Sequence, residues 1–304
     1  MRKTLFSGIA ACLLATAATA AEQSPSVIWT VGQADRSASE FALAPDRFRD
    51  FLANDFGYED KYFLVGHSVP AADFPYVLPG PADTWGGTWP TSGWRTHQVN
   101  ILFGLKEIPS DGTCTLVVDL LDYAKNFLPL VKVSVNTQDA KFQLDAPGLS
   151  VADQRKPNQM EKIVDTLSIT GNLAKATPRR LEIPIRPGVL KAGGNEVTIT
   201  VLEGSWILFD RVSLEGPAGT NVEQPQQLFI RNIEAAPYEL ADGKRRVQPL
   251  LVDLEWLEGA PALSVELDGK EILNQRIETG RYQLEAPMPV SYTHLRAHET
   301  PEHL

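Results

Sequence analysis

The stretch GGNEVTITVL at residues 193–202 decides the fold. Val197, Ile199 and Val201 alternate with polar residues, so an extended chain would place apolar side chains on one face and polar ones on the other. The Gly-Gly-Asn tripeptide before this alternation is typical of a tight turn. The stretch therefore predicts a turn followed by a β-strand with one face in a hydrophobic core.

Similar patterns recur on both sides of this stretch as alternating or short apolar runs bounded by Gly, Pro, Asn and Asp. Helical spacing is scarce, and its best example, residues 45–53, is short. The strands expected before residue 217 favour a two-sheet sandwich of the jelly-roll type. They cover residues 26–31, 61–65, 96–105, 114–121, 130–135, 180–185, 195–202 and 206–215.

A second run of strands follows a Gly-, Pro- and Gln-rich segment at residues 217–227, which we interpret as a linker. Within that run, Asp268-Gly269 is a strong signal for a hairpin turn. Its candidate strands cover residues 228–235, 247–254, 262–267, 271–277 and 281–286. The predicted fold class is all-β, with a jelly-roll β-sandwich over residues 21–216 followed by a small immunoglobulin-like β-sandwich domain over residues 228–289, which we expect to be incomplete.

The two ends of the chain are expected to lie outside the native mature protein. Residues 1–20 combine a basic start, an apolar run and a closing Ala-Thr-Ala, the pattern of a signal peptide. That run is shorter than the roughly 20 residues of a membrane-spanning helix, so we expect no membrane span and a secreted or periplasmic bacterial protein. Residues 290–304 resemble a translated sequencing adapter and are expected to be a non-native tail. We therefore exclude its histidines, His294, His298 and His303, as metal ligands.

Charge and cysteine content argue against two kinds of function. The chain has a net charge of −10, and removing the leader (+2) and the tail (−1) leaves −11. Nucleic acid is therefore not an expected partner, because phosphate binding requires a basic surface. Without the leader, Cys114 is the one remaining cysteine, so an internal disulfide and a paired-cysteine metal site are excluded. Its place in a predicted strand indicates a buried, inert thiol.

A tryptophan-rich loop, WGGTWPTSGW at residues 85–94, is the most informative candidate site. Aromatic rings among glycines are not explained by the period of a strand, whereas the C–H faces of sugar rings pack well on exposed aromatic rings. Nearby Asp and Arg side chains would then hydrogen-bond sugar hydroxyls. The predicted carbohydrate-binding residues are Asp83, Trp85, Trp89, Trp94 and Arg95. The alternative is that the loop folds back and buries its tryptophans.

Enzymatic signatures are weaker. Glycoside hydrolysis needs two carboxylates at a defined separation, and no pair stands out among Glu59, Asp60, Asp119, Asp122 and Asp210. An eliminating lyase needs a base, and His97 is more typical of a structural or ligand-contact histidine. We therefore predict no catalytic residue. A lyase or hydrolase active within this chain, through His97 or an acid pair, remains an alternative.

The first predicted domain resembles the C-terminal carbohydrate-binding-like domain of rhamnogalacturonan lyases of polysaccharide lyase family 4, over residues 26–216. The resemblance rests on WTVG at 29–32 with Asp35, Ser37 and Glu40-Phe41, on Asp55-Phe56, on GNEVTI at 194–199 and on ILFDRVSLE at 207–215. It implies a jelly-roll accessory fold, because the catalytic Lys and His of that family lie in a separate N-terminal domain. The tryptophan-rich loop is not part of the family pattern.

Jelly-roll sugar modules often carry a structural calcium ion, held by oxygen ligands near the start and end of the domain. Asp35, Glu40 and Asp210 are the candidate ligands by residue type and position. The alternative is that these three residues are ordinary surface acids.

The leading hypothesis is a secreted carbohydrate-binding accessory module of a polysaccharide-degrading enzyme whose catalytic domain lies downstream. Its expected partners are a polysaccharide or oligosaccharide and that catalytic domain. Two alternatives remain: a chain that is itself a lyase or hydrolase, and a purely structural unit that shapes the cleft of the missing domain.

Overall fold

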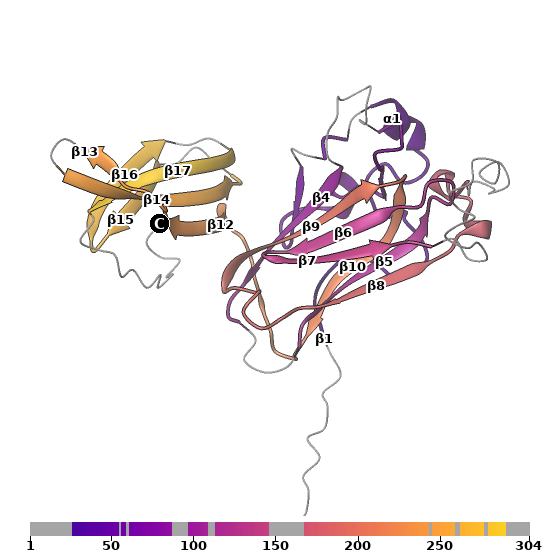
Figure 1. The fold of residues 1–304 in the computed structure, drawn as a ribbon, viewed down its shortest axis with the longest axis horizontal. Helices are drawn as coiled ribbons and strands as arrows, with labels where there is room; N and C mark the ends of the chain where they lie inside the picture. The colour runs from indigo at the N-terminus through magenta and orange to yellow at the C-terminus, as the bar shows by residue number, and fades with distance from the viewer. Residues whose placement is uncertain are drawn as a thin grey trace, which may run out of the picture.

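The computed structural model describes residues 26–54, 56–58, 61–86, 97–108, 113–145, 167–242, 245–258, 262–276 and 279–289. These residues form two β-sandwiches, drawn side by side in Figure 1, with the C-terminal one in orange and yellow. No helix in the described part of the chain is long and apolar enough to cross a membrane.

The large sandwich consists of two mostly antiparallel sheets. The first has the order β1 (Ser26–Gly32), β10 (Ile207–Gly216), β5 (Thr115–Tyr123) and β8 (Arg179–Pro184), with β3 (Val77–Leu78) also on β10. The second has the order β11 (Val222–Glu223), β4 (Gln98–Leu105), β9 (Gly193–Glu203), β6 (Leu130–Val135) and β7 (Gln138–Gln143), with β2 (Tyr62–Leu64) parallel to β4. The strand orders β1-β10-β5-β8 and β4-β9-β6-β7 are those of the two sheets of a jelly roll, which confirms the predicted fold class.

The core of the large sandwich follows from the alternation seen in the sequence. Val197, Ile199 and Val201 on β9 are fully buried between the sheets, as the pattern predicts. They pair in register with β4 on one side and β6 on the other. A cluster of aromatic rings fills part of the core, and in it the ring centres of Phe74 and Phe209 lie 5.1 Å apart.

Helical structure is confined to short segments, in agreement with the sequence. The expected helix at residues 45–53 is α1 (Phe48–Ala53), and a second short helix is α2 (Pro70–Asp73). Two 3-10 turns, η1 (Leu167–Thr170) and η2 (Leu173–Lys175), precede β8. Phe51 of α1 is buried against Tyr76, with ring centres 5.4 Å apart.

The small sandwich pairs a four-stranded sheet with a hairpin. The sheet has β14 (Arg245–Trp256) at its centre, flanked by β12 (Leu228–Ala235), β13 (Leu240–Asp242) and β17 (Gly280–Pro289). The hairpin consists of β15 (Ala262–Leu267) and β16 (Lys270–Arg276). Its turn residues Asp268 and Gly269 both have positive φ, 51° and 73°, as the Asp-Gly signal predicts. The core of the small sandwich consists of Val252, Leu254, Trp256 and Leu263.

The two sandwiches meet along β2, β4 and β9 of the large one and β12 of the small one. An apolar cluster of Leu64, Leu102 and Phe229 lies at this joint. Polar contacts surround it, because Arg231 pairs with Glu255 of the small sandwich and with Glu196 of the large one. β4 is therefore buried on both faces. Within residues 217–227, the expected linker, β11 adds a short strand to the large sandwich.

A buried ion pair ties β5 to the segment before β8. Asp122 is 0% exposed, and its carboxylate accepts hydrogen bonds from Lys125 Nζ (2.8 Å), Ser168 Oγ (2.7 Å) and the Thr177 amide (3.0 Å). The ammonium of Lys125 also lies 3.2 Å from the ring centre of Tyr123. Burial lowers the pKa of Lys125.

Cys114 precedes β5 and is buried, as its place in the sequence indicates. The Cys114 sulfur lies close to the backbone of Gly216. A Cβ added to Gly216 would lie 2.8 Å from this sulfur. Burial raises the pKa of the thiol, so the unreactive, protonated form is favoured.

Candidate functional site

The segment leading into the tryptophan-rich loop is fixed to the turn between β9 and β10. Asp83 is 8% exposed, and its carboxylate accepts hydrogen bonds from the Gly80 amide (2.8 Å) and from the hydroxyl of Ser205. The Ala82 amide donates to the Gly204 carbonyl at 2.9 Å. Both carboxylate oxygens of Asp83 thus bond to the protein itself. Asp83 therefore anchors the loop, and this anchoring had no signal in the sequence.

Gly80 is required at this anchor for a steric reason. A Cβ on Gly80 would lie 2.5 Å from the carbonyl oxygen of Gly204 and 2.8 Å from that of Ser205. The backbone at Gly80, in the segment before the loop, therefore approaches the backbone of the turn between β9 and β10 as closely as glycine allows. This contact fixes the position of the segment that leads into the loop.

Trp85 begins the loop and is half-buried. Its indole packs edge-on against Phe51, with ring centres 6.0 Å apart and planes at 64°. One side of this ring therefore rests on the core, as the alternative of a folded-back loop anticipated, and the rest is accessible. Trp89, Trp94 and Arg95 lie outside the described residues.

His97 follows the loop and is 4% exposed. Its ring meets Tyr58 edge-on at 5.8 Å, and the Tyr58 hydroxyl donates to the Val77 carbonyl at 3.1 Å. The side chain is packed against Tyr58, as the structural interpretation of His97 predicts. A general base must reach its substrate, and this burial argues against such a role for His97.

The acids considered for catalysis are largely engaged in ion pairs. Asp119 pairs with Arg211 at 3.0 Å and with Arg180 at 3.4 Å, and Asp122 pairs with Lys125. Glu59 and Asp60 lie outside the described residues. Asp119 and Asp122 are thus held by basic side chains of the protein itself.

The three acids predicted to hold calcium accept hydrogen bonds from a loop after β1. Asp35 Oδ1 accepts from the Ser37 amide (2.9 Å), Glu40 Oε1 from the Gln33 amide (2.9 Å) and Asp210 Oδ1 from the Arg36 amide (3.1 Å). Burial raises the pKa of Asp210 to about 6, with a further contribution from the charge of Asp35. Among the residues that the structure describes, no three His, Cys, Asp or Glu side chains are arranged to hold a metal ion. Calcium stays a prediction.

The raised pKa of Asp210 has a consequence for stability. In the unfolded chain this carboxyl titrates near 3.8, and in the folded protein near 6. The folded state therefore binds the proton more tightly, and the contribution of Asp210 to the free energy of unfolding falls as the pH rises between these values, by about 1 to 3 kcal/mol. We expect Asp210→Asn to remove this dependence and to be more stable than the wild type at pH 7, measured by urea unfolding at pH 4 to 7.

The same titration tests the calcium prediction. A bound calcium ion stabilises the ionised carboxylate, so added calcium chloride would reverse the pH dependence in the wild type and leave Asp210→Asn unchanged. A wild type whose stability relative to Asp210→Asn is constant over this pH range contradicts the assigned titration.

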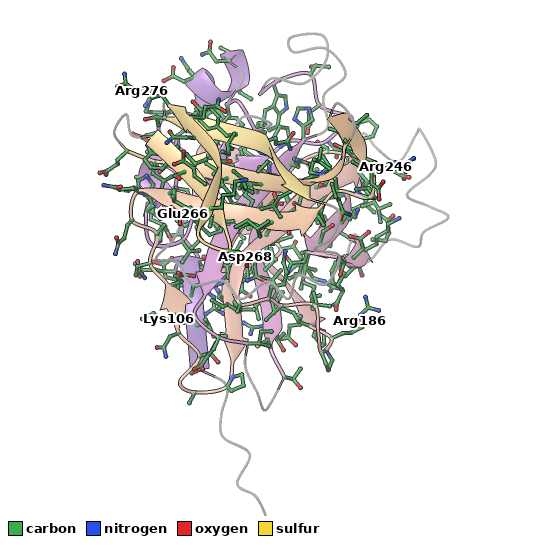
Figure 2. All side chains as sticks on the ribbon, turned by 90° about the vertical axis from the view of Figure 1, so that its left-hand side faces the viewer. Lys106, Arg186, Arg246, Glu266, Asp268 and Arg276 are labelled. Atoms are coloured by element: carbon green, nitrogen blue, oxygen red, sulfur yellow. The ribbon has the colours of Figure 1, made fainter. Side chains whose placement is uncertain are left out.

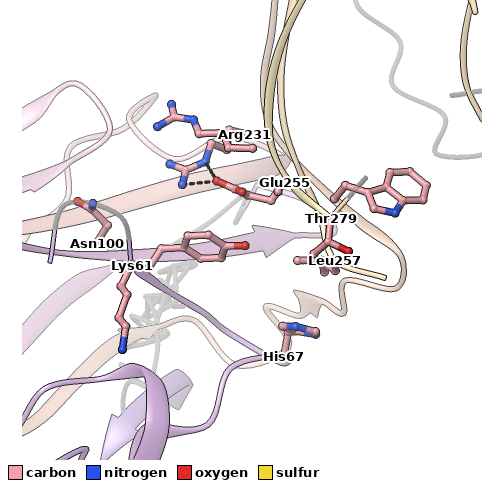
Figure 3. A pocket seen from close by; sticks show the side chains of 11 residues that line it. Lys61, His67, Asn100, Arg231, Glu255, Leu257 and Thr279 are labelled. Atoms are coloured by element: carbon pink, nitrogen blue, oxygen red, sulfur yellow. Dashed lines mark hydrogen bonds and ion pairs between the residues drawn. The ribbon is translucent and has the colours of Figure 1, made fainter. Parts of the chain in front are cut away.

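A pocket of about 380 Å³ lies at the joint between the sandwiches, and sequence reasoning missed it. Figure 3 shows Arg231 and Glu255 on one side of it and Lys61 and His67 on the other. Burial, followed by the charge of Glu255, raises the pKa of Tyr62 to about 12. The lining residues are Lys61, Tyr62, His67, Asn100, Arg231, Glu255, Trp256, Leu257, Thr279, Gly280 and Arg281. They come from segments far apart in the chain, so no local motif marks them.

The match to a protein-family model agrees with this architecture. The sequence profile of a family described as CBM-like, polysaccharide lyase family 4, domain III, matches residues 27–214. No curated protein matches this chain. Among solved structures, a family GH115 4-O-methyl-α-glucuronidase with specificity for decorated arabinogalactans is similar at 17% identity and a TM-score of 0.23. The match covers 40% of this chain and 13% of that enzyme. The profile spans more than half of the sequence, and the chain therefore belongs to the carbohydrate-binding-module-like family of polysaccharide lyase family 4, domain III.

Proposed function

We propose that this chain is a secreted carbohydrate-binding accessory module of a polysaccharide-degrading enzyme whose catalytic domain lies downstream in the parent protein. The observation that carries the proposal is the tryptophan-rich loop mounted on a jelly roll of this family. Asp83, Gly80 and Ser205 fix the loop base on the sandwich. A rigid base lowers the entropy lost when a flat aromatic ring captures a sugar.

The state of the candidate catalytic groups supports binding over catalysis. His97 is buried beside Tyr58, and Asp119 and Asp122 pair with arginine and lysine. Trp85, in contrast, is half-buried at the surface. The proposed ligand contacts are Trp85, Trp89, Trp94 and Arg95, and Asp83 acts through the loop position.

The test is the substitution Trp89→Ala in the full chain. We expect it to weaken binding to the best ligand on a glycan array by tenfold or more, because loss of one stacking surface of about 1.4 kcal/mol changes the affinity tenfold. Tyr238→Ala is the matched control, since this aromatic residue is 43% exposed and belongs to the small sandwich. Affinity is measured by titration calorimetry with the array's best ligand.

Two outcomes would contradict the proposal. Equal affinities for Trp89→Ala and Tyr238→Ala would remove the loop from the binding site. Release of unsaturated or reducing sugar ends by the chain alone would favour the lyase or hydrolase alternative instead.

The joint between the sandwiches favours a second candidate function. Leu64, Leu102 and Phe229 are buried there, and such a fixed unit would suit a structural role in shaping the cleft of a neighbouring catalytic domain. Under that alternative the chain binds no glycan by itself on the array.

A further inference from the structure

The pocket at the joint is a candidate binding site separate from the tryptophan-rich loop. None of the described residues that line it lies in that loop. Tyr62 and Asn100 come from the large sandwich, and Trp256 and Arg281 come from the small one. Its volume of about 380 Å³ falls in the range of about 300 to 1,000 Å³ that small-molecule pockets occupy.

Among the lining residues that the structure describes, the exposed charges are positive. Lys61 and Arg281 are exposed, whereas Glu255, the one acid among these described residues, is 1% exposed. Glu255 is neutralised by Arg231, whose Nη2 and Nε lie 2.6 and 2.7 Å from Glu255 Oε1. A positive pocket in a chain of net charge −10 selects an anionic ligand over a neutral one.

Arg281 is positioned to receive such a ligand. Its Nε and Nη2 donate to the two oxygens of Asp253 at 3.1 and 2.8 Å, which orients the guanidinium. The side chain remains 50% exposed, and a guanidinium has five N–H donors, so those on Nη1 can meet a carboxylate. Lys61, whose ammonium lies 4.1 Å from the ring centre of Phe56, provides a second positive charge.

The remaining lining residues fit a ligand rich in hydroxyl groups. Tyr62 and Trp256 contribute aromatic surface, while Asn100, His67 and Thr279 contribute hydrogen-bonding side chains. An apolar acid would leave these polar groups without partners, which is costly in a partly buried site.

We propose that the pocket between the two sandwiches binds a polyhydroxylated carboxylate through Arg281 and Lys61. The carboxylate can belong to an acidic sugar unit of a glycan or to a free sugar acid. Because both sandwiches contribute walls, the ligand stabilises the joint when it binds.

The test is calorimetric titration of the full chain with trigalacturonate, neutral galactotriose and free gluconate. We expect an acidic probe to bind at least tenfold more tightly than galactotriose and to raise the melting temperature. Arg281→Gln and Lys61→Gln should each weaken that binding tenfold or more. Arg246→Gln is the matched control, because Arg246 is 79% exposed, pairs with Glu239 and lies at the periphery of the small sandwich (Figure 2).

A second variant distinguishes the loss of a ligand contact from the loss of the local structure. Asp253→Asn removes the ion pair of Arg281 but keeps its charge, so it should bind the acidic probe at least as tightly as the wild type. Binding of trigalacturonate alone identifies a glycan as the source of the carboxylate, and equal binding of gluconate identifies a free acid. The proposal is overturned if galactotriose binds equally, if neither acid binds, if Arg281→Gln behaves as Arg246→Gln, or if Asp253→Asn loses as much affinity as Arg281→Gln.

Discussion

Replacing Asp122 with alanine is expected to lower the free energy of unfolding by about 3 to 5 kcal/mol. The carboxylate is 0% exposed and bonds to Lys125, Ser168 and the Thr177 amide. Its loss leaves the ammonium of Lys125 buried without a counter-charge, which costs far more than the net value of the pair. It also detaches the segment containing η1 and η2 from β5.

This expectation is measured by urea unfolding of the full chain. The control is Asp139→Ala, since the pair of Asp139 with Lys132 is exposed to solvent and should contribute little to stability. The double variant Asp122→Ala with Lys125→Met should recover much of the lost stability, because no charge remains buried. A cost for Asp122→Ala no larger than that for Asp139→Ala would show that Lys125 reaches water when its partner is removed.

Gly194→Ala is expected to open the joint between the sandwiches. An added Cβ would lie 2.1 Å from the carbonyl oxygen of Ile230 and 3.1 Å from that of Arg231. Both atoms are backbone, so rotation of a side chain cannot relieve the clash and β12 must move away from β9. Overpacking of this kind costs about 1 to 3 kcal/mol, and exposure of Phe229 and Leu102 adds to it.

Limited proteolysis and thermal unfolding check this prediction. We expect Gly194→Ala to be cleaved faster within residues 217–227 and to lose the thermal shift caused by the acidic probe, while each sandwich keeps its β-structure. Glu203→Ala, at the exposed end of the same strand, is the matched control and should behave as the wild type. Unchanged cleavage of Gly194→Ala would mean that the sandwiches are not held in the contact described.

Local patterns predicted the strands well, because alternation and turn residues act over a few positions. The stretch around Val197 and the Asp268-Gly269 hairpin are examples, and both are confirmed. The continuous apolar run of β4 has no alternation, and its outer face is explained by Phe229 of the small sandwich, which covers Leu102. That contact is tertiary, so the sequence does not reveal it.

The candidate site was predictable as a segment and not as a set of contacts. The aromatic composition marked residues 85–94, but the partner of Asp83 is Ser205, a residue 122 positions away. A carboxylate beside tryptophans suggested ligand contact, whereas the fold uses it as an anchor. In the same way, Arg231, Glu255 and Tyr62 form one cluster at the joint although nothing in their local sequence links them.

Burial of the Cys114 thiol limits its oxidation to a disulfide. The chain has two cysteines, Cys12 in the expected leader and Cys114. If the leader is removed, Cys114 has no internal partner, and in an oxidising compartment its hazard would be a mixed disulfide with another molecule. Exchange requires a thiolate that an incoming disulfide can reach. Burial beside Gly216 keeps an incoming disulfide away from the sulfur, and the raised pKa of the thiol disfavours the thiolate. Both effects last as long as the strands stay paired. Formation of a disulfide between two copies is thereby restricted to chains that have not yet folded.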